Sequence, residues 1–233
     1  MPRRDPPTPR EARLRVRTPT TLRLARERIA RLHLVCPPCE DTHSFTSLAP
    51  RRLHECDTIS KMPPPRILHV TPYSEHAWAY GGIPRVVAAQ THGLAARGIA
   101  VTVATTDACD RERRLPRPDA GGRLQPFRLD DDDLEVQVFP NLSNSLAYRL
   151  QLFTPSGLGA FLRHAAGTFD VAHLHGCHNL TGAIAARWLK GAGVPYVVQP
   201  NGTAPRIERR RLAKLMFDAT LGRRVLPSAA AVV

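Results

Sequence analysis

Residues 66–98 read RILHVTPYSEHAWAYGGIPRVVAAQTHGLAARG, and this stretch decides the fold class. Its first five residues are a short apolar run that predicts a buried strand. From Pro84 onward apolar residues recur at helical spacing until Gly98. A proline at the first helical position and a glycine just past the last one are the usual helix boundary signals. The stretch therefore predicts a strand, a turn that contains glycine, and a helix.

The turn at Gly81-Gly82 predicts an anion site. Backbone N–H groups at the start of a helix lack partners within the helix, and the positive end of the helix dipole lies at the same point. We expect a phosphate to bind there, and Arg85 could add a charge-assisted contact. The turn matches neither GxGxxG nor a Walker A sequence. A turn without a ligand, with Arg85 in solvent, therefore remains the alternative.

The chain is basic, with 233 residues and a formal net charge of +13. Such a charge favours nucleic acid, an anionic membrane surface or a phosphorylated substrate as partner. No run of about 18 apolar residues is present, as a membrane-spanning helix would require. The N-terminus also lacks the apolar region of a secretory signal. We therefore expect a cytoplasmic protein with five reduced cysteines, with peripheral contact at the inner membrane face as a variant of that location.

The first 65 residues differ from the rest of the chain. They are rich in arginine and proline and end in three prolines, which predicts a disordered basic leader. Met62 lies four residues before the first strand, so we also consider that residues 1–61 are a non-native extension and Met62 the natural start. Residues 66–233 form the second expected unit.

Strands and helices alternate from Arg66 onward, which predicts an α/β fold: a Rossmann-like parallel sheet with helices on both faces. Right-handed crossovers place the loops that follow the strands along one edge, where such sheets bind ligands. Asp130 to Asp133 are expected in a long solvated loop. Thr154-Pro155 are expected to cap a helix. The expected strands after the first are 100–105, 135–139, 170–175, 194–199 and 229–233.

A cluster of histidines follows Asp170. Strand alternation puts His173 and His175 on one face and Leu174 on the other, and His175 falls at the carboxyl end of its strand. Histidines and a cysteine so close together raise the question of zinc, but no carboxylate is nearby and the context is a strand, so we expect no metal. Histidines packed under a loop are one alternative. A polar substrate contact or a catalytic role for His175 is the favoured one.

A basic helix is expected over residues 207–226, with an apolar face opposite a charged one. Most such helices pack on a sheet. A role at an anionic membrane surface is the alternative interpretation.

Several blocks in order resemble the N-terminal half of a GT-B fold glycosyltransferase of the large retaining family 4. The resemblance covers roughly residues 66–233. The blocks are Ile67 to Pro72, Gly81 to Val86, Leu94 to Gly98, Asp170 to Gly176, and Gly193 to Gly202.

This resemblance implies transfer of a sugar from a nucleotide-sugar donor to a saccharide or lipid-linked acceptor, without an essential metal or other cofactor. It implies that Gly81-Gly82 approach the donor diphosphate and the acceptor. His175 matches the family's histidine that contacts a donor-sugar hydroxyl. Asn201-Gly202 would lie in an acceptor-side loop. The family's donor-binding domain would follow this half, and we expect the 233-residue chain to transfer no sugar by itself.

Two rival functions are less well supported. A stand-alone nucleotide- or phosphate-binding Rossmann module would need an acidic residue after the second strand. Asp107 is near that place, but no GxGxxG precedes it. A basic nucleic-acid-binding protein would interleave aromatic residues with lysine and arginine. Aromatic residues make up only 6% of the chain, so we expect no nucleic-acid partner.

Overall fold

The computed structural model describes residues 64–131, 134–201 and 211–233. The expected leader, apart from Pro64 and Pro65, and the start proposed at Met62 lie outside the described residues. Within them, seven strands form one sheet of order β3-β4-β2-β1-β5-β6-β7. Neighbouring strands are parallel except β3 and β4. The strands are β1 (Arg66–Val70), β2 (Ala100–Thr106), β3 (Phe127–Asp131), β4 (Leu134–Phe139), β5 (Val171–His175), β6 (Tyr196–Gln199) and β7 (Ala231–Val232).

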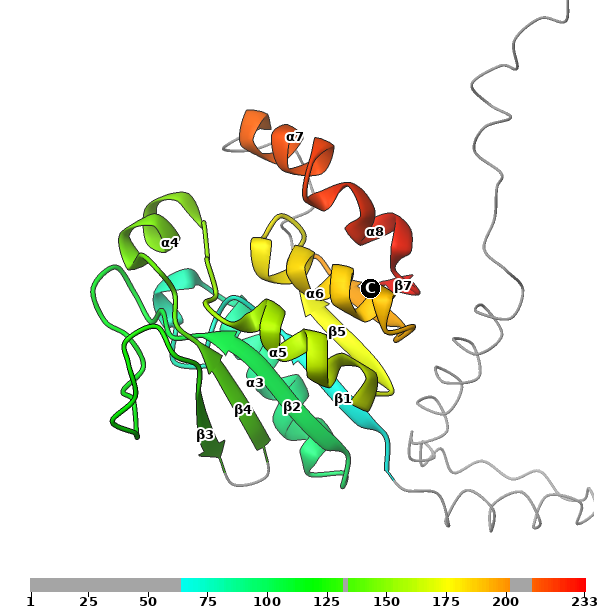
Figure 1. The fold of residues 1–233 in the computed structure, drawn as a ribbon, viewed down its shortest axis with the longest axis horizontal. Helices are drawn as coiled ribbons and strands as arrows, with labels where there is room; N and C mark the ends of the chain where they lie inside the picture. The colour runs from blue at the N-terminus through cyan, green and yellow to red at the C-terminus, as the bar shows by residue number, and fades with distance from the viewer. Residues whose placement is uncertain (1–63, 132–133, 202–210) are drawn as a thin grey trace, which may run out of the picture. The chain divides into compact units, whose positions relative to one another are not determined.

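Helices cover both faces of this sheet. Helices α5 and α6 lie over one face and α3 lies over the other (Figure 1). A parallel sheet between two helical layers is the predicted Rossmann-like α/β fold, which is confirmed. The α-helices are α3 (Ile83–Ala95), α4 (Asn144–Leu150), α5 (Leu158–Ala165), α6 (Leu180–Gly191), α7 (Arg211–Ala219) and α8 (Val225–Ser228), and the short 3-10 helices are η2 (Trp78–Tyr80), η3 (Ala166–Thr168) and η4 (Gly222–Arg224).

The order of the strands reverses at β1. From β1 the chain forms β2, then the edge strand β3, and then β4 between them. It returns to the other side of β1 to form β5, β6 and β7. The loops that follow β1 and β5 therefore leave the sheet in opposite directions. In open α/β sheets, ligands bind in the crevice that this reversal creates at the carboxyl ends of the strands.

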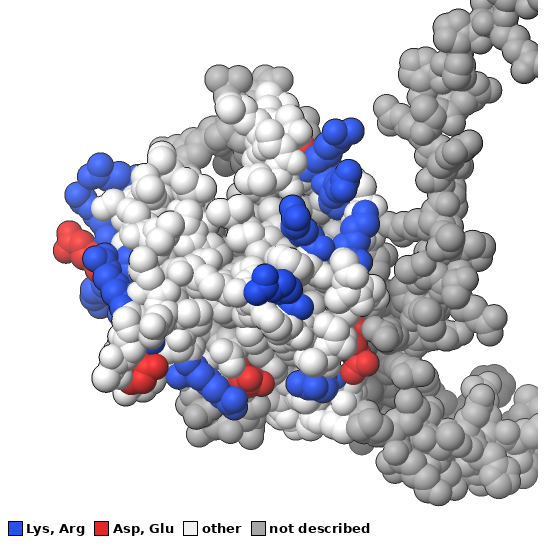
Figure 2. Space-filling view, viewed as in Figure 1, with Lys and Arg blue, Asp and Glu red and all other residues white. Residues whose placement is uncertain are grey.

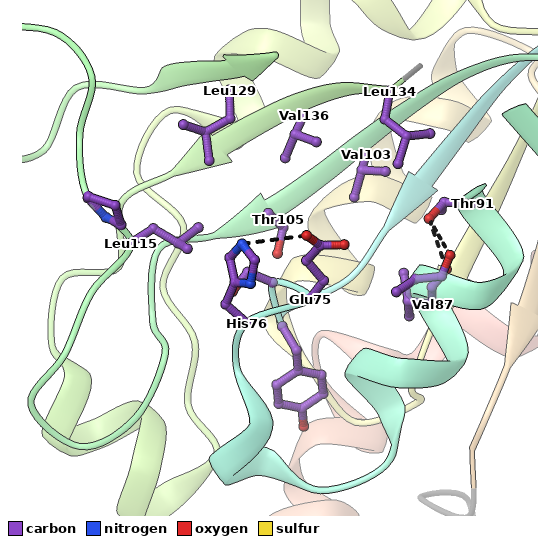
Figure 3. Close-up of a pocket in the computed structure, with 14 residues that line it drawn as sticks. Glu75, His76, Val87, Thr91, Val103, Thr105, Leu115, Leu129, Leu134 and Val136 are labelled. Atoms are coloured by element: carbon purple, nitrogen blue, oxygen red, sulfur yellow. Dashed lines mark hydrogen bonds and ion pairs between the residues drawn. The ribbon is translucent and has the colours of Figure 1, made fainter. Parts of the chain in front are cut away.

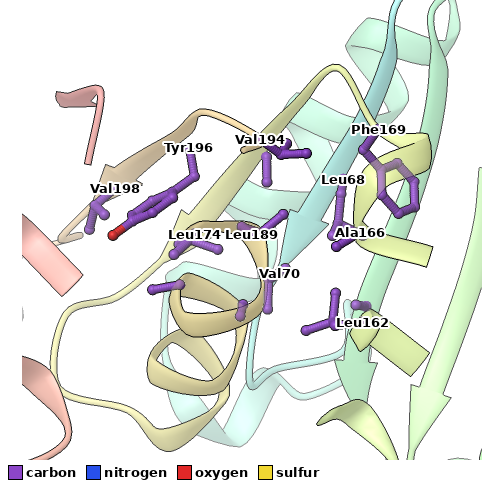
Figure 4. Close-up of a cluster of buried hydrophobic side chains, with 14 of the residues drawn as sticks. Leu68, Val70, Leu162, Ala166, Phe169, Leu174, Leu189, Val194, Tyr196 and Val198 are labelled. Carbon is purple, nitrogen blue, oxygen red and sulfur yellow. The ribbon is translucent and has the colours of Figure 1, made fainter. Parts of the chain in front are cut away.

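The face under α5 and α6 is a dry hydrophobic core, and we call it the α5–α6 face (Figure 4). Leu68 and Leu174 on the sheet, and Leu162 and Leu189 on the helices, have no exposed surface. Complete burial of a side chain of this size contributes about 1.5–3 kcal/mol. This core holds the sheet flat against α5 and α6 and fixes which side chains face the other way.

Strand β3 corrects the expectation that Asp130 to Asp133 lie in a loop. Asp130 and Asp131 belong to β3, which pairs antiparallel with β4, whereas residues 132–133 lie outside the described residues. Phe127 of this strand is buried against Val138. An edge strand in a hairpin needs apolar side chains on one face only, so its sequence is more polar than that of a central strand.

Helix α5 begins later than the sequence predicts. Its N-cap is Gly157, with φ of 83°, and not Thr154. The hydroxyl and N–H of Thr154 instead bond to Asn141 Oδ1, at 3.0 and 2.6 Å. Thr154 therefore ties two loops together. The short helix α4, which lies between these loops, has no counterpart among the sequence predictions.

The basic helix expected over residues 207–226 is not continuous. The described part is divided into α7, η4 and α8, and residues 207–210 lie outside the described residues. At Gly222 the backbone passes against the ring of Phe217, where a Cβ atom would collide with that ring. A glycine at this position therefore permits the close approach of the chain after α7 ends.

Candidate functional site

The loop between β1 and α3 leaves the start of α3 open. Gly81 has a φ of 95°, which residues with a Cβ rarely adopt. Gly82 is the N-cap of α3, and no side chain caps the helix there. A Cβ atom built on either glycine would meet nothing within 4 Å. Both glycines are exposed, but the Gly81 N–H already donates to the Trp78 carbonyl at 3.2 Å, so the uncapped amides of the helix start begin at Gly82. The anion site itself stays a prediction.

Arg85 is engaged with an aromatic ring. Its guanidinium carbon lies 4.6 Å from the centre of the Trp78 ring, in a cation–π arrangement. Trp78 is 62% exposed, although tryptophan usually buries most of its surface. The sequence analysis missed Trp78; its only signal was a large aromatic residue in the loop before the two glycines. Together these residues form an exposed platform beside the open helix end.

Three histidines form what we call the histidine layer: His69 on β1 and His173 and His175 on β5. All three project to the α3 side of the sheet because their neighbours on the same strands face α5 and α6. His69 Nδ1 lies 3.0 Å from His175 Nε2, which is a hydrogen bond. The His173 and His175 rings are stacked with centroids 4.3 Å apart. Sequence reasoning found the two β5 residues and missed His69.

The histidine layer is neutral at pH 7. Burial lowers the pKa of His69 to about 3, with a further contribution from His173. Burial lowers the pKa of His173 to about 4, and the neighbouring Gln199 side chain opposes this shift. Burial, and then the other two histidines, lower the pKa of His175 to about 2. A neutral imidazole has one N–H donor and one acceptor nitrogen, so the layer presents both kinds of group.

The His69–His175 bond restricts the outer nitrogens of both rings. His69 Nε2 and His175 Nδ1 are buried and have no hydrogen-bond partner. Whichever ring donates in the shared bond, one of these two outer nitrogens is left as a donor and the other as an acceptor. The pair therefore offers complementary groups of the kind that a hydroxyl can satisfy.

A metal fits the histidine layer poorly as it is arranged. One nitrogen from each of the three rings lies within 4.8 Å of the others, so the residue types and spacing suit zinc. However, an imidazole binds a metal in the plane of its ring, and the His173 and His175 rings are stacked at an angle of only 25°. One ion cannot lie close to both nitrogens in both planes unless a ring turns. The arrangement instead matches a stacked, hydrogen-bonded layer.

Further polar atoms without partners lie at the carboxyl end of β6. Gln199 pairs in register with His175, and its Oε1 is buried and unpartnered. Asn201 follows with a left-handed φ of 50° and a buried, unpartnered Nδ2. Buried polar atoms are nearly always satisfied, so a cluster of exceptions needs a reason. Gly202, the neighbour predicted to share this loop, lies outside the described residues.

The parallel topology brings the predicted site residues to one edge. The Gly81-Gly82 loop follows β1, His175 ends β5 and Asn201 follows β6. His175 itself has no exposed surface. The predicted contact of His175 with a sugar therefore stays a prediction, and the accessible groups at this edge are the helix start and the Trp78–Arg85 platform.

Asp107, the residue that a nucleotide-binding module would need, has a structural role. Its carboxylate accepts hydrogen bonds from the Asn141 N–H and from Arg114 Nη1, both at 2.7 Å. Arg114 Nη1 also donates to the Asn141 carbonyl at 2.7 Å. We call these three residues the Asp107 clasp. It joins the loop after β2 to the loop after β4, and the Asp107 side chain is only 6% exposed there.

Comparison with known proteins identifies the family of the domain. Residues 81–233 match a family model described as a glycosyl transferase 4-like domain. The match begins at the first glycine of the loop before α3 and continues through β7. No curated protein matches the chain significantly.

Proposed function

This chain belongs to the glycosyl transferase 4-like family, and on that premise we propose that it supplies the acceptor-side half of a retaining, metal-independent sugar-transfer site. The donor in this proposal is a nucleotide-sugar and the acceptor is a saccharide or lipid-linked molecule. The open start of α3 at Gly81-Gly82 meets the donor diphosphate. The loop at Asn201 meets the acceptor.

The observation that carries the proposal is the unpaired outer nitrogens of His69 and His175 at the same sheet edge as the open start of α3. A sugar hydroxyl both donates and accepts, so it would satisfy groups that the protein leaves unsatisfied. The departing diphosphate would be stabilised by backbone amides and the helix dipole, which replace a metal. Because His175 is fully buried, contact with a sugar requires the residues that cover it to move.

In this proposal, sugar transfer takes place in a cleft with two sides. The described sheet edge forms one, and a donor-binding domain would form the other. We propose that the 233-residue chain by itself turns over no nucleotide-sugar and binds one weakly. A radiolabelled-sugar assay that finds robust turnover by this chain would contradict its proposed inactivity. The same result would support the proposed sugar-transfer reaction.

Nuclear magnetic resonance tests the proposed site without requiring turnover. UDP-glucose and GDP-mannose are titrated separately into the ¹⁵N-labelled chain. We expect at least one of them to shift the Gly81 and Gly82 amide signals. The shifts should be reduced in His175→Ala and kept in His164→Ala, a control at an exposed histidine of α5. No shift at these amides with either donor, or equal shifts in both variants, would overturn the assignment.

A second proposal concerns the surface beside α6. Arg187, Lys190, Arg223 and Arg224 surround a hollow of about 550 Å³ between α6 and the α7–α8 segment. Figure 2 shows basic side chains gathered on this side of the molecule. Leu221 and Met216 nearby are 60% and 70% exposed. No helix among the described residues is long and apolar enough to cross a bilayer.

We propose that this surface contacts an anionic membrane peripherally, because cationic side chains beside exposed apolar ones suit the headgroup region. Vesicles of phosphatidylglycerol should sediment the chain, and vesicles of phosphatidylcholine should not. Arg223→Glu with Arg224→Glu should weaken sedimentation several-fold. The paired control, Arg111→Glu with Arg123→Glu, reverses two exposed charges in the loop after β2. Equal loss in both double variants would contradict a specific surface.

A further inference from the structure

A cavity of about 360 Å³ lies on the α3 side of the sheet, and its lining includes Val103, the β2 partner of His69, but none of the three histidines. We call it the α3 pocket. Strand residues form one wall, α3 forms the facing wall, and the loop after β1 closes one end (Figure 3).

The two ends of the α3 pocket differ in chemistry. The end at the carboxyl edge of the sheet carries Ser74, Glu75 and His76. Glu75 Oε1 lies 3.4 Å from Nε2 of the well-exposed His76, and Glu75 Oε2 lies 3.1 Å from His92 Nε2. The other end is apolar. This end is lined by strand residues, namely Val103 on β2, Leu129 on β3, and Leu134 and Val136 on β4.

Thr105 lines the α3 pocket between these ends. The residue is 1% exposed, and its Oγ1 is buried without a hydrogen-bond partner. A buried hydroxyl without a partner costs free energy, so a ligand in the pocket would satisfy it once the side chains over it shift. Thr105 therefore marks the point at which a polar part of a ligand would give way to an apolar part.

We infer that the α3 pocket binds an amphiphile, with its aliphatic chain between α3 and β4 and its hydroxylated head at Thr105 and the loop after β1. Small-molecule sites combine mostly apolar walls with a few polar groups that fix orientation, and this pocket has that division along its length. The inference rests on the proposed sugar transfer, because it assigns the amphiphile as the acceptor. The head lies toward the edge that carries Gly81-Gly82, and the chain points away from it.

The test uses n-octyl β-D-glucoside below its critical micelle concentration, with methyl β-D-glucoside as the probe that lacks the chain. Binding to the full chain is followed by the methyl signals of valine and leucine. We expect octyl glucoside to shift Val103 and Val136 saturably and to leave Leu68 and Leu174, on the α5–α6 face, unchanged. Methyl glucoside should bind at least tenfold more weakly. Equal effects on both sets of methyl groups, or no saturation, would overturn the inference.

Two variants separate the effect of filling the apolar end of the pocket from the effect of removing the Thr105 hydroxyl. Val136→Phe fills the apolar end and should weaken octyl glucoside binding at least tenfold. Val232→Phe makes the same change at a residue that is 55% exposed and should have no effect. Thr105→Val preserves the shape of the side chain and should weaken octyl glucoside binding several-fold. This variant tests the pocket if Val136→Phe does not fold. Unchanged binding in Thr105→Val and in folded Val136→Phe would contradict the pocket.

The transfer reaction distinguishes this inference from the proposed function. If the chain together with a donor-binding domain glycosylates octyl glucoside and Val136→Phe abolishes this, both hold. If a soluble saccharide is glycosylated and octyl glucoside neither binds nor reacts, the pocket inference fails and the proposed function stands. If octyl glucoside binds in the pocket and no acceptor is ever glycosylated, the proposed function fails, and with it the assignment of the amphiphile as acceptor.

Discussion

The two faces of the sheet differ in polarity and in packing. On the α5–α6 face, leucines, valines and alanines from sheet and helices interlock with almost no exposed surface. On the α3 face, the same strands present three histidines, an unpaired threonine hydroxyl and a cavity. Alternate residues of one strand thus serve different purposes. The dry face supplies the stability that lets the other face keep unsatisfied polar groups.

The largest effect on stability should come from a substitution on the α5–α6 face. Leu174→Ala removes a fully buried side chain whose neighbours on β5 are His173 and His175. We expect it to lower the free energy of unfolding by about 3 kcal/mol, as for other buried leucines. Denaturant unfolding with urea measures this. A loss below 1 kcal/mol would mean that the face is less tightly packed than its burial indicates.

The histidine layer should instead make the free energy of unfolding depend on pH. The pKa of His173 is lowered to about 4 in the folded chain from 6.5. Between these pH values the unfolded chain binds a proton that the folded chain does not, so stability is present above pH 6.5 and is lost as the pH falls. His173→Asn should make this decline shallower by about 1.4 kcal/mol per pH unit.

Urea unfolding at several pH values from 7 to 4.5 measures that slope. Leu174→Ala serves as the control, because the loss of an apolar contact should lower stability by a similar amount at each pH. A wild-type slope that His173→Asn leaves unchanged would show that the histidine is not buried in neutral form.

The smallest effects should come from two adjacent threonines that point to opposite faces. Thr106 Oγ1 donates to the Pro72 carbonyl at 2.7 Å, whereas Thr105 Oγ1 has no partner. Thr106→Val should cost about 1–2 kcal/mol because it also leaves a buried carbonyl unpaired. Thr105→Val should change stability by less than about 0.5 kcal/mol, since it removes a group that is already unsatisfied.

Thermal unfolding of the two valine variants, side by side, gives this comparison. Equal losses would indicate that Thr105 has a partner in solution, such as a bound water, and would weaken its role in the α3 pocket.

Local sequence patterns were sufficient for the scaffold. The periodicity before Gly98 predicted α3 closely, and strand alternation placed His173 and His175 on one face and Leu174 on the other, as observed. These features depend on residues that are near one another in the chain. The family resemblance rested on the same blocks, and the family match confirms it.

Contacts between distant segments could not be obtained in this way. His69 and His175 are 106 residues apart, and their hydrogen bond depends on the register between β1 and β5. The α3 pocket depends on how far α3 lies from β4, which no local pattern encodes. Thr154 has the sequence of a helix cap, but a distant asparagine provides a competing partner.

The Asp107 clasp has a consequence for motion. Asp107 and Arg114 hold the loop after β2 against the backbone of Asn141, and Asn141 in turn holds Thr154 before α5. Three loops that are far apart in sequence therefore share one set of hydrogen bonds. Local opening of any one of them must break bonds of the others, so they are expected to fluctuate as a single cooperative unit and not as independent loops.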